Sequence, residues 1–70
     1  MTTRELAFYR DLGARIRAAR EAAGMTQLAL AMELGRDASV SIHHYEHAKR
    51  RIDPYTLRRL ERVLGQELYR

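Results

Sequence analysis

Residues 24–46, GMTQLALAMELGRDASVSIHHYE, decide the fold of this chain. They predict two short helices that are separated by a tight polar turn. Thr26 is a suitable N-cap for the first helix, because its hydroxyl accepts a hydrogen bond from an unpaired backbone N–H of the first turn. Leu30 and Leu34 then recur at helical spacing, and Gly35 follows at a position where helices commonly end.

The second of these helices has two different faces. Ile42, Tyr45 and Glu46 fall on one face at helical spacing. The opposite face and its margins carry small and imidazole side chains, namely Ser39, Val40, His43, His44 and His47. One side of this helix is therefore expected to be buried, while the other offers hydrogen-bonding groups to a partner.

A long helix is predicted before this stretch, and a shorter one after it. The long helix begins at the capping box Thr2-Thr3-Arg4-Glu5 and ends at Gly24. Its apolar stripe consists of Phe8, Leu12, Ile16, Ala19 and Ala23. The later helix begins at Asp53-Pro54, where an N-cap precedes a proline at the first helical position, and ends at Gly65. Its buried stripe consists of Leu57, Leu60 and Leu64, and Leu68 is in phase to add a last turn.

Length and composition limit the class of protein. The 70 residues make one domain with a small core, because a chain of this size buries only about 60% of its unfolded surface. The chain contains no cysteine, which excludes disulfides and thiolate zinc sites. No apolar run approaches the roughly 20 residues of a membrane span, so a cytoplasmic protein without a membrane anchor is expected. The net charge of +4 favours an anionic partner.

Several motifs together resemble a known family. The matching residues are Gly24-Met25-Thr26-Gln27, Leu30-Ala31, Leu34-Gly35, Ile42, Tyr45-Glu46, Lys49-Arg50, Pro54 and the stripe of Leu57, Leu60 and Leu64. Over about residues 11–65, the chain resembles the Cro/C1-type (XRE) helix-turn-helix DNA-binding domain. The resemblance implies an all-α, lambda-repressor-like bundle of four to five helices, with residues 1–70 as a single domain and the motif at residues 26–46. In this family, the second helix crosses the phosphate backbone and the third helix enters the major groove.

The chain departs from the family pattern in two places. The turn between Gly35 and the Ser41-Ile42 pair holds five residues, from Arg36 to Val40, where the family usually has one fewer. The register of this turn decides which of its residues touch DNA. Only residues 66–70 remain after Gly65, so the fifth helix, which often supplies dimer contacts in the family, is shortened or lost.

The resemblance and the positions of polar side chains predict the DNA contacts. The predicted contact residues are Gln27, Arg36, Ser39, Val40, Ser41, His43, His44, His47, Lys49, Arg50 and Arg51. The last three directly follow the helix that would enter the groove, so phosphate contact is favoured over a merely solvated loop. Gln27 is by resemblance a phosphate or base contact, although it would also suit the first turn of a helix. Val40 would either touch a thymine methyl group or fill the longer turn.

His43 and His47 lie one helical turn apart, as the paired ligands of zinc-binding helices do. A zinc site needs a third ligand, and the nearby Glu46 is expected to serve the core, so neither a metal nor another cofactor is predicted. Arg20 lies at the edge of the apolar stripe of the first helix, and the family pattern places an Arg–Glu pair at the positions of Arg20 and Glu46. We therefore predict an ion pair between these two residues.

The predicted function is that of a small transcriptional regulator. The chain shows no paired-carboxylate, glycine-rich phosphate-loop or Ser/His/Asp signature of an enzyme. By resemblance it is a repressor that recognises a pseudo-palindromic operator in double-stranded DNA as a homodimer, and we expect a small dimer contact from Leu64, Leu68 and Tyr69 that forms on DNA. Leu28 and Met32 are expected to pack under Phe8 or Tyr9. If they form a partner surface instead, the alternative function is an antitoxin-like protein-interaction module.

Overall fold

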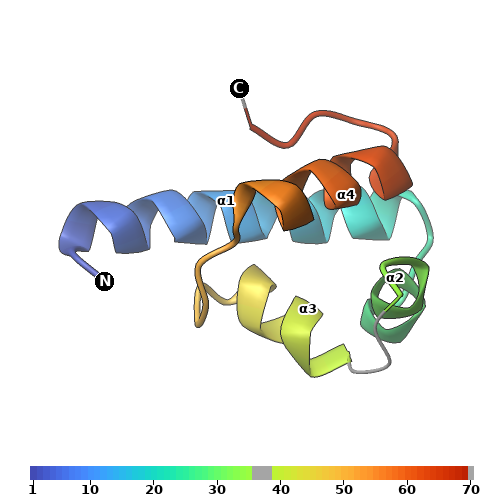
Figure 1. Ribbon diagram of the computed structural model, residues 1–70, viewed down its shortest axis with the longest axis horizontal. Helices are drawn as coiled ribbons and strands as arrows, with labels where there is room; N and C mark the ends of the chain where they lie inside the picture. The colour runs from blue at the N-terminus through green and yellow to red at the C-terminus, as the bar shows by residue number, and fades with distance from the viewer. Residues whose placement is uncertain (36–38, 70) are drawn as a thin grey trace.

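The computed structural model describes residues 1–35 and 39–69, apart from the side chains of Ser39 and Val40. The described residues form four helices and no strand: α1 (Thr3–Ala22), α2 (Gln27–Glu33), α3 (Ser39–Glu46) and α4 (Pro54–Leu64). Figure 1 shows α1 and α4 lying side by side, with α3 beneath them and α2 at one end of the molecule. The predicted all-α helix-turn-helix bundle is therefore confirmed.

The expected capping residues set the starts of three helices. At α1, the hydroxyl of Thr2 accepts from the N–H of Glu5 at 3.1 Å, and the Glu5 carboxylate accepts from the N–H of Thr2 at 3.0 Å. This completes the predicted capping box. Thr26 and Asp53 begin α2 and α4, and each accepts a hydrogen bond from the backbone N–H three residues later.

The hydrophobic core lies where the four helices meet. Its largest fully buried side chains are Leu12, Ile16, Leu30, Leu34, Ile42 and Leu60. Phe8 and Tyr9 pack against this core from the first half of α1. The predicted stripe of α1 packs as expected except at Ala23, which is exposed because it lies at the C-cap, after the last helical residue.

The helices α1 and α3 approach each other closely at Gly13. A Cβ atom at this position would lie 2.5 Å from the carbonyl oxygen of Tyr45 and 2.7 Å from that of Glu46. Such distances are too short for a real Cβ contact, so a glycine is needed for the end of α3 to pack against α1 here. Nothing in the local sequence marks this glycine, because the requirement comes from another helix.

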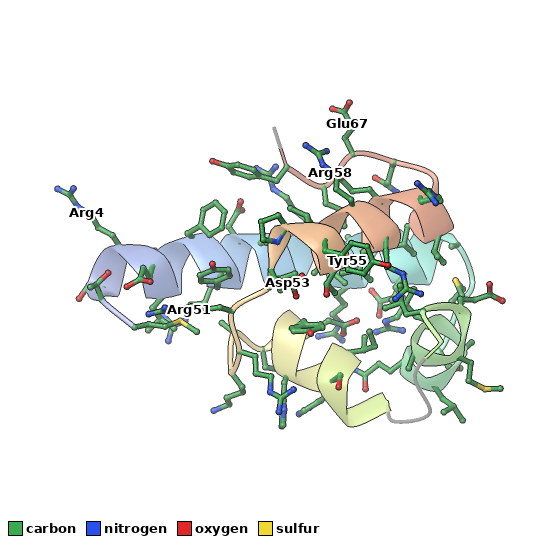
Figure 2. All side chains as sticks on the ribbon, viewed as in Figure 1. Arg4, Arg51, Asp53, Tyr55, Arg58 and Glu67 are labelled. Atoms are coloured by element: carbon green, nitrogen blue, oxygen red, sulfur yellow. The ribbon has the colours of Figure 1, made fainter. Side chains whose placement is uncertain are left out.

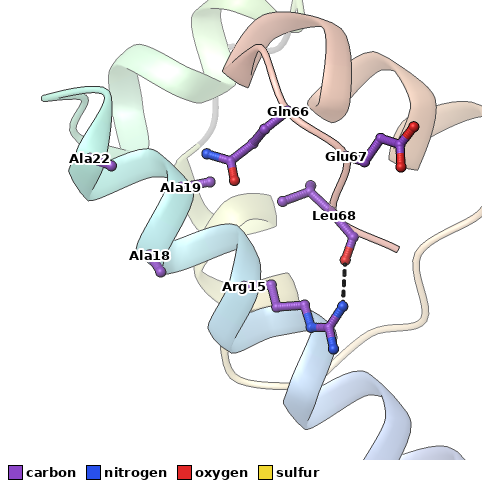
Figure 3. Close-up of a pocket in the computed structure, with 7 residues that line it drawn as sticks. All are labelled: Arg15, Ala18, Ala19, Ala22, Gln66, Glu67 and Leu68. Atoms are coloured by element: carbon purple, nitrogen blue, oxygen red, sulfur yellow. Dashed lines mark hydrogen bonds between the residues drawn. The ribbon is translucent and has the colours of Figure 1, made fainter. Parts of the chain in front are cut away.

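After α4 the chain turns back and runs along α1. Gly65 adopts a left-handed conformation with φ 71°, which ends α4. Leu68 is then only 2% exposed, and its N–H donates to Glu61 Oε2 at 2.9 Å. Its carbonyl oxygen accepts from Arg15 Nη1 at 3.1 Å, as the dashed line in Figure 3 shows. Residues 66–68 also line one side of a pocket whose other side is formed by α1 (Figure 3). Contacts with both α1 and α4 thus hold this C-terminal segment in place.

Two expectations about the C-terminal segment are wrong. Leu68 does not add a helical turn, because its side chain is drawn into the core instead. Leu64 is also buried, at 8% exposure, so neither leucine is free to form the expected dimer contact. Tyr69 is 43% exposed, but its ring already packs edge-to-face on Phe8, with 4.8 Å between the ring centroids.

Glu61 is expected to make the stability of the fold depend on pH. The hydrogen bond from the backbone N–H of Leu68 is the main cause that lowers the pKa of Glu61, and the bond from Arg58 lowers it further. A lowered folded-state pKa stabilises the protein above the unfolded pKa of about 4.3, and this contribution is lost as the pH falls through the folded-state value. Glu61→Gln should therefore lower the Tm more near pH ~7 than near pH ~3, which lies below the unfolded-state pKa.

Thermal melts followed by circular dichroism at both pH values measure this difference. The control is Glu33→Gln, which removes an exposed carboxylate from α2 and should change the Tm little at either pH. An equal loss of Tm from Glu61→Gln at both pH values would show that the charge of Glu61 does not hold the C-terminal segment.

Candidate nucleic-acid interface

Arg20 on α1 and Glu46 at the end of α3 form the expected ion pair. Arg20 Nε donates to Glu46 Oε2 at 2.6 Å, and Arg20 Nη2 donates to Glu46 Oε1 at 3.1 Å. The two side chains are only 11% and 1% exposed, so water competes little for the pair. The hydrogen bond with Glu46 raises the pKa of Arg20. A bidentate charged contact therefore adds to the apolar packing that holds α3 against α1.

The Glu46 carboxylate also connects α3 to α2. Gln27, the first residue of α2, donates from Nε2 to Glu46 Oε1 at 3.1 Å. Arg20 Nη1 donates to the carbonyl oxygen of Met25, just before α2, at 2.8 Å. Glu46 thus joins three helices at one point. Gln27 has an internal partner that its sequence position did not reveal, and DNA contact by Gln27 stays a prediction.

The face of α3 that points away from the core presents imidazole groups. His43 and His47 are exposed, and their ring centroids lie 4.3 Å apart. His44 is partly buried, with its ring centroid 6.1 Å from that of His43. The Nδ1 atom of His44 is buried and has no hydrogen-bond partner within the described part of the chain. The structure therefore separates His44 from an exposed pair formed by His43 and His47.

The connection between α3 and α4 presents basic side chains to solvent. Ala48 and Ile52 are only 6% and 7% exposed and anchor the two ends of this connection. Lys49 and Arg50, which lie between these anchors, are exposed. The backbone N–H of Lys49 donates to the carbonyl oxygen of His44 at 2.8 Å, so the connection continues directly from the last turn of α3. Two cationic side chains are thus fixed close to the end of the imidazole-bearing helix.

Arg51, which follows these two residues, forms an ion pair with Glu5 of α1. Its Nη2 lies 3.0 Å from Glu5 Oε2, and the two side chains remain 61% and 38% exposed. In Figure 2, Arg51 lies on the side of α1 where α3 packs, whereas Arg58 extends from the opposite side of the molecule. Exposed ion pairs contribute little to stability, so exchange of Glu5 for another anion costs Arg51 little.

A comparison with protein families identifies a helix-turn-helix domain in this chain. A family model described as a helix-turn-helix domain matches residues 11–68. The chain belongs to this helix-turn-helix family. The family comprises XRE/Cro-like domains, so the family resemblance of the sequence is confirmed. No curated protein and no solved structure matches the chain.

In this helix-turn-helix domain, α2 and α3 both lie within residues 26–46, where the sequence predicts the motif. The helix-turn-helix family is a family of DNA-binding domains. The family match extends to Leu68, past the residue 65 at which the resemblance was expected to end. The buried Leu68 and its contact with Glu61 are therefore within the matched region.

Some predicted contacts of the helix-turn-helix domain lie outside the described residues. Arg36 belongs to residues 36–38, and the side chains of Ser39 and Val40, at the start of α3, are likewise outside the described part of the chain. DNA contact at these three positions stays a prediction, as does the register of the turn. Ser41, one position further along α3, is partly buried.

The expected packing of Leu28 and Met32 under the first helix is wrong. In the helix-turn-helix domain these side chains are 50% and 64% exposed on α2. The inner face of α2 is already filled by Leu30 and Ala31, both 0% exposed, which leaves Leu28 and Met32 on the outer face.

The described part of the helix-turn-helix domain contains no ready-made metal centre. Within it, no group of three or more His, Asp or Glu side chains could hold a metal ion. The close pair of His43 and His47 therefore comes without a third protein ligand.

None of the described helices is long and apolar enough to cross a membrane.

Proposed function

We propose that this domain binds a specific site in double-stranded DNA with α3 in the major groove, and that it represses transcription by occupying a promoter. The observation that carries this proposal is the position of two exposed cations, Lys49 and Arg50, directly after an exposed imidazole face on α3. Glu46 ties α3 to α1 and α2, which suits a helix whose side chains must meet base edges in a fixed register.

Each predicted contact residue has a chemical role in this complex. Lys49 and Arg50 contact phosphates, because cations beside the groove neutralise the DNA backbone. Gln27 contacts the backbone from the other end of the motif, and Arg51 does so after leaving Glu5. The imidazole N–H groups of His43, His44 and His47 donate to base acceptors or phosphate oxygens. Arg36, Ser39, Val40 and Ser41 provide further contacts around the start of α3.

Two copies of the domain act together on a pseudo-palindromic operator. A single reading helix contacts few base pairs, and two-fold symmetry places two such helices about 34 Å apart on one side of the duplex. Because Leu64 and Leu68 are buried, the contact between the copies uses other surface residues. A small contact of this kind forms on DNA, where the two half-sites hold the copies next to each other.

Arg50→Ala tests the assignment of the basic connection. The substitution should lower the affinity of the domain for two duplexes to the same extent. One duplex is an operator selected from random sequences, and the other is an unrelated duplex. It should also reduce the slope of log K against log salt concentration by about one unit, because fewer counterions are released. Fluorescence anisotropy with both duplexes over a salt series measures both effects.

The charge-matched control is Arg10→Ala. Arg10 is an exposed residue of α1 on the side away from the apolar stripe, so its loss should leave the salt slope nearly unchanged. A loss of affinity in Arg50→Ala that is confined to one base pair of the operator would make Arg50 a base-contacting residue. Equal effects of the two substitutions would contradict a phosphate contact at this connection.

The exposure of Leu28 and Met32 favours a second function, which is binding of a protein partner through the outer face of α2. The double substitution Leu28→Gln/Met32→Gln separates the two functions. If DNA binding is the function, the double variant should bind the selected operator as tightly as the unaltered domain does. If the unaltered domain fails to bind any duplex at low salt, the protein-interaction function becomes the better proposal.

A further inference from the structure

His43 and His47 are close enough to bind one ion together. His43 lies on α3, and His47 directly follows the last residue of this helix, where its backbone N–H donates to the carbonyl oxygen of His43 at 3.1 Å. Both side chains are exposed, and their ring centroids are 4.3 Å apart with an angle of 44° between the rings. With metal–nitrogen bonds of about 2.0–2.1 Å, the ring centres of two imidazoles in adjacent coordination positions lie about 4.4 Å apart at a right angle and about 5.2 Å apart at a tetrahedral angle. Small side-chain rotations would therefore bring this pair to a chelating distance. We propose that His43 and His47 form a chelating pair for a divalent first-row transition-metal ion at the C-terminal end of α3.

The proposed site uses two protein ligands and no more. The ring centroid of His44 is 6.1 Å from that of His43, and its Nδ1 points into the protein, where it is buried. No third His, Asp or Glu joins the pair within the described residues. The remaining coordination positions therefore belong to water, and the ion exchanges with solvent instead of supporting the fold.

The chemistry of the pair selects the class of ion. Imidazole nitrogens suit Cu²⁺, Ni²⁺ and Zn²⁺, whereas Mg²⁺ and Ca²⁺ prefer oxygen ligands. Affinity for a given nitrogen site rises from Ni²⁺ to Cu²⁺ and falls again at Zn²⁺. The pair should therefore bind Cu²⁺ most tightly and should show no measurable binding of Mg²⁺.

The consequence for regulation rests on the proposed function. An imidazole nitrogen that is bound to a metal ion cannot donate a hydrogen bond to a base, and chelation fixes both rings in one arrangement. The ion also adds positive charge, which attracts any duplex regardless of sequence. The ratio of the affinity for the selected operator to the affinity for random DNA should therefore fall. By linkage, metal binding to the operator complex must then be weaker than metal binding to the random-DNA complex by the same factor.

The metal site is tested first without DNA. The 70-residue chain is titrated with Zn²⁺ alone, and the ring signals of the three histidines are followed by NMR. Zn²⁺ should shift the ring signals of His43 and His47 together, and His43→Ala or His47→Ala should weaken binding by at least about tenfold. The matched control is His44→Ala, which should leave Zn²⁺ affinity unchanged. All three positions are solvent-facing or partly so, and amide spectra confirm that each variant is folded.

Three results would overturn the chelating pair. They are absence of Zn²⁺ binding by the unaltered chain, equal binding after His47→Ala, and an equal loss after His44→Ala. A second titration, of operator and random duplexes with and without Zn²⁺, tests the regulatory step. If Zn²⁺ binds to His43 and His47 but leaves the ratio of the two affinities unchanged, the metal site stands. The proposed placement of His43 and His47 in the groove is then wrong.

Discussion

Replacing Glu46 with alanine is expected to bring this domain close to unfolding at room temperature. The substitution strands Arg20, which is 11% exposed, and leaves the Gln27 amide without its acceptor. Removing one partner of a buried ion pair typically costs about 3–5 kcal/mol, because the other charge stays buried and uncompensated. Small domains have about 5–15 kcal/mol of stability in total, so this loss removes a large share of it. Urea titrations of the unaltered domain and the variant measure the loss.

An exposed ion pair in the same protein provides the control. Arg17 and Glu21 lie four residues apart on α1 at 3.5 Å, and both side chains are 57% exposed. Glu21→Ala should cost no more than about 0.5 kcal/mol, because exposed helical pairs contribute little. A loss of less than about 1 kcal/mol from Glu46→Ala would mean that the Arg20–Glu46 pair contributes no more to stability than an exposed ion pair does.

Gly13→Ala is expected to destabilise the domain although it improves the helix propensity of α1. At an unobstructed helical site, this change would stabilise the protein by about 1 kcal/mol. Here the added Cβ would lie 2.5 Å from the carbonyl oxygen of Tyr45 and 2.9 Å from the carbonyl carbon of Glu46. These are backbone atoms of α3, so the whole helix must shift to admit the methyl group. Overpacking of this kind costs about 1–3 kcal/mol.

The shift of α3 caused by Gly13→Ala should also weaken DNA binding, because α3 carries the imidazole face. Affinity for the selected operator should fall more than affinity for random DNA, since base contacts need an accurate helix position. Ala14→Gly is the control: Ala14 is exposed beside Gly13 on α1, and its replacement should cost about 1 kcal/mol without changing operator preference. A gain in stability from Gly13→Ala would contradict the close packing of α1 against α3.

Much of the fold follows from interactions between residues that are close in sequence. Thr2, Thr26 and Asp53 cap the helices that the sequence predicts, because a cap needs only a side chain and the next turn of backbone. Leu30 and Ile42 are buried as their helical spacing predicts. The helix-turn-helix family could also be identified from the sequence, since its motif spans contiguous residues. The predicted DNA contacts follow from the same motif and stay predictions.

The remaining features depend on neighbours that are distant in the sequence. Gly13 matters because α3 passes over it, and Leu68 is buried because Glu61 and Arg15 bind its backbone. Leu28 is exposed, although it is apolar, because other residues already fill the inner face of α2. Helical periodicity states which side chains share a face, but it does not state which element covers that face or how closely. Only the packing of the four described helices and the C-terminal segment decides these points.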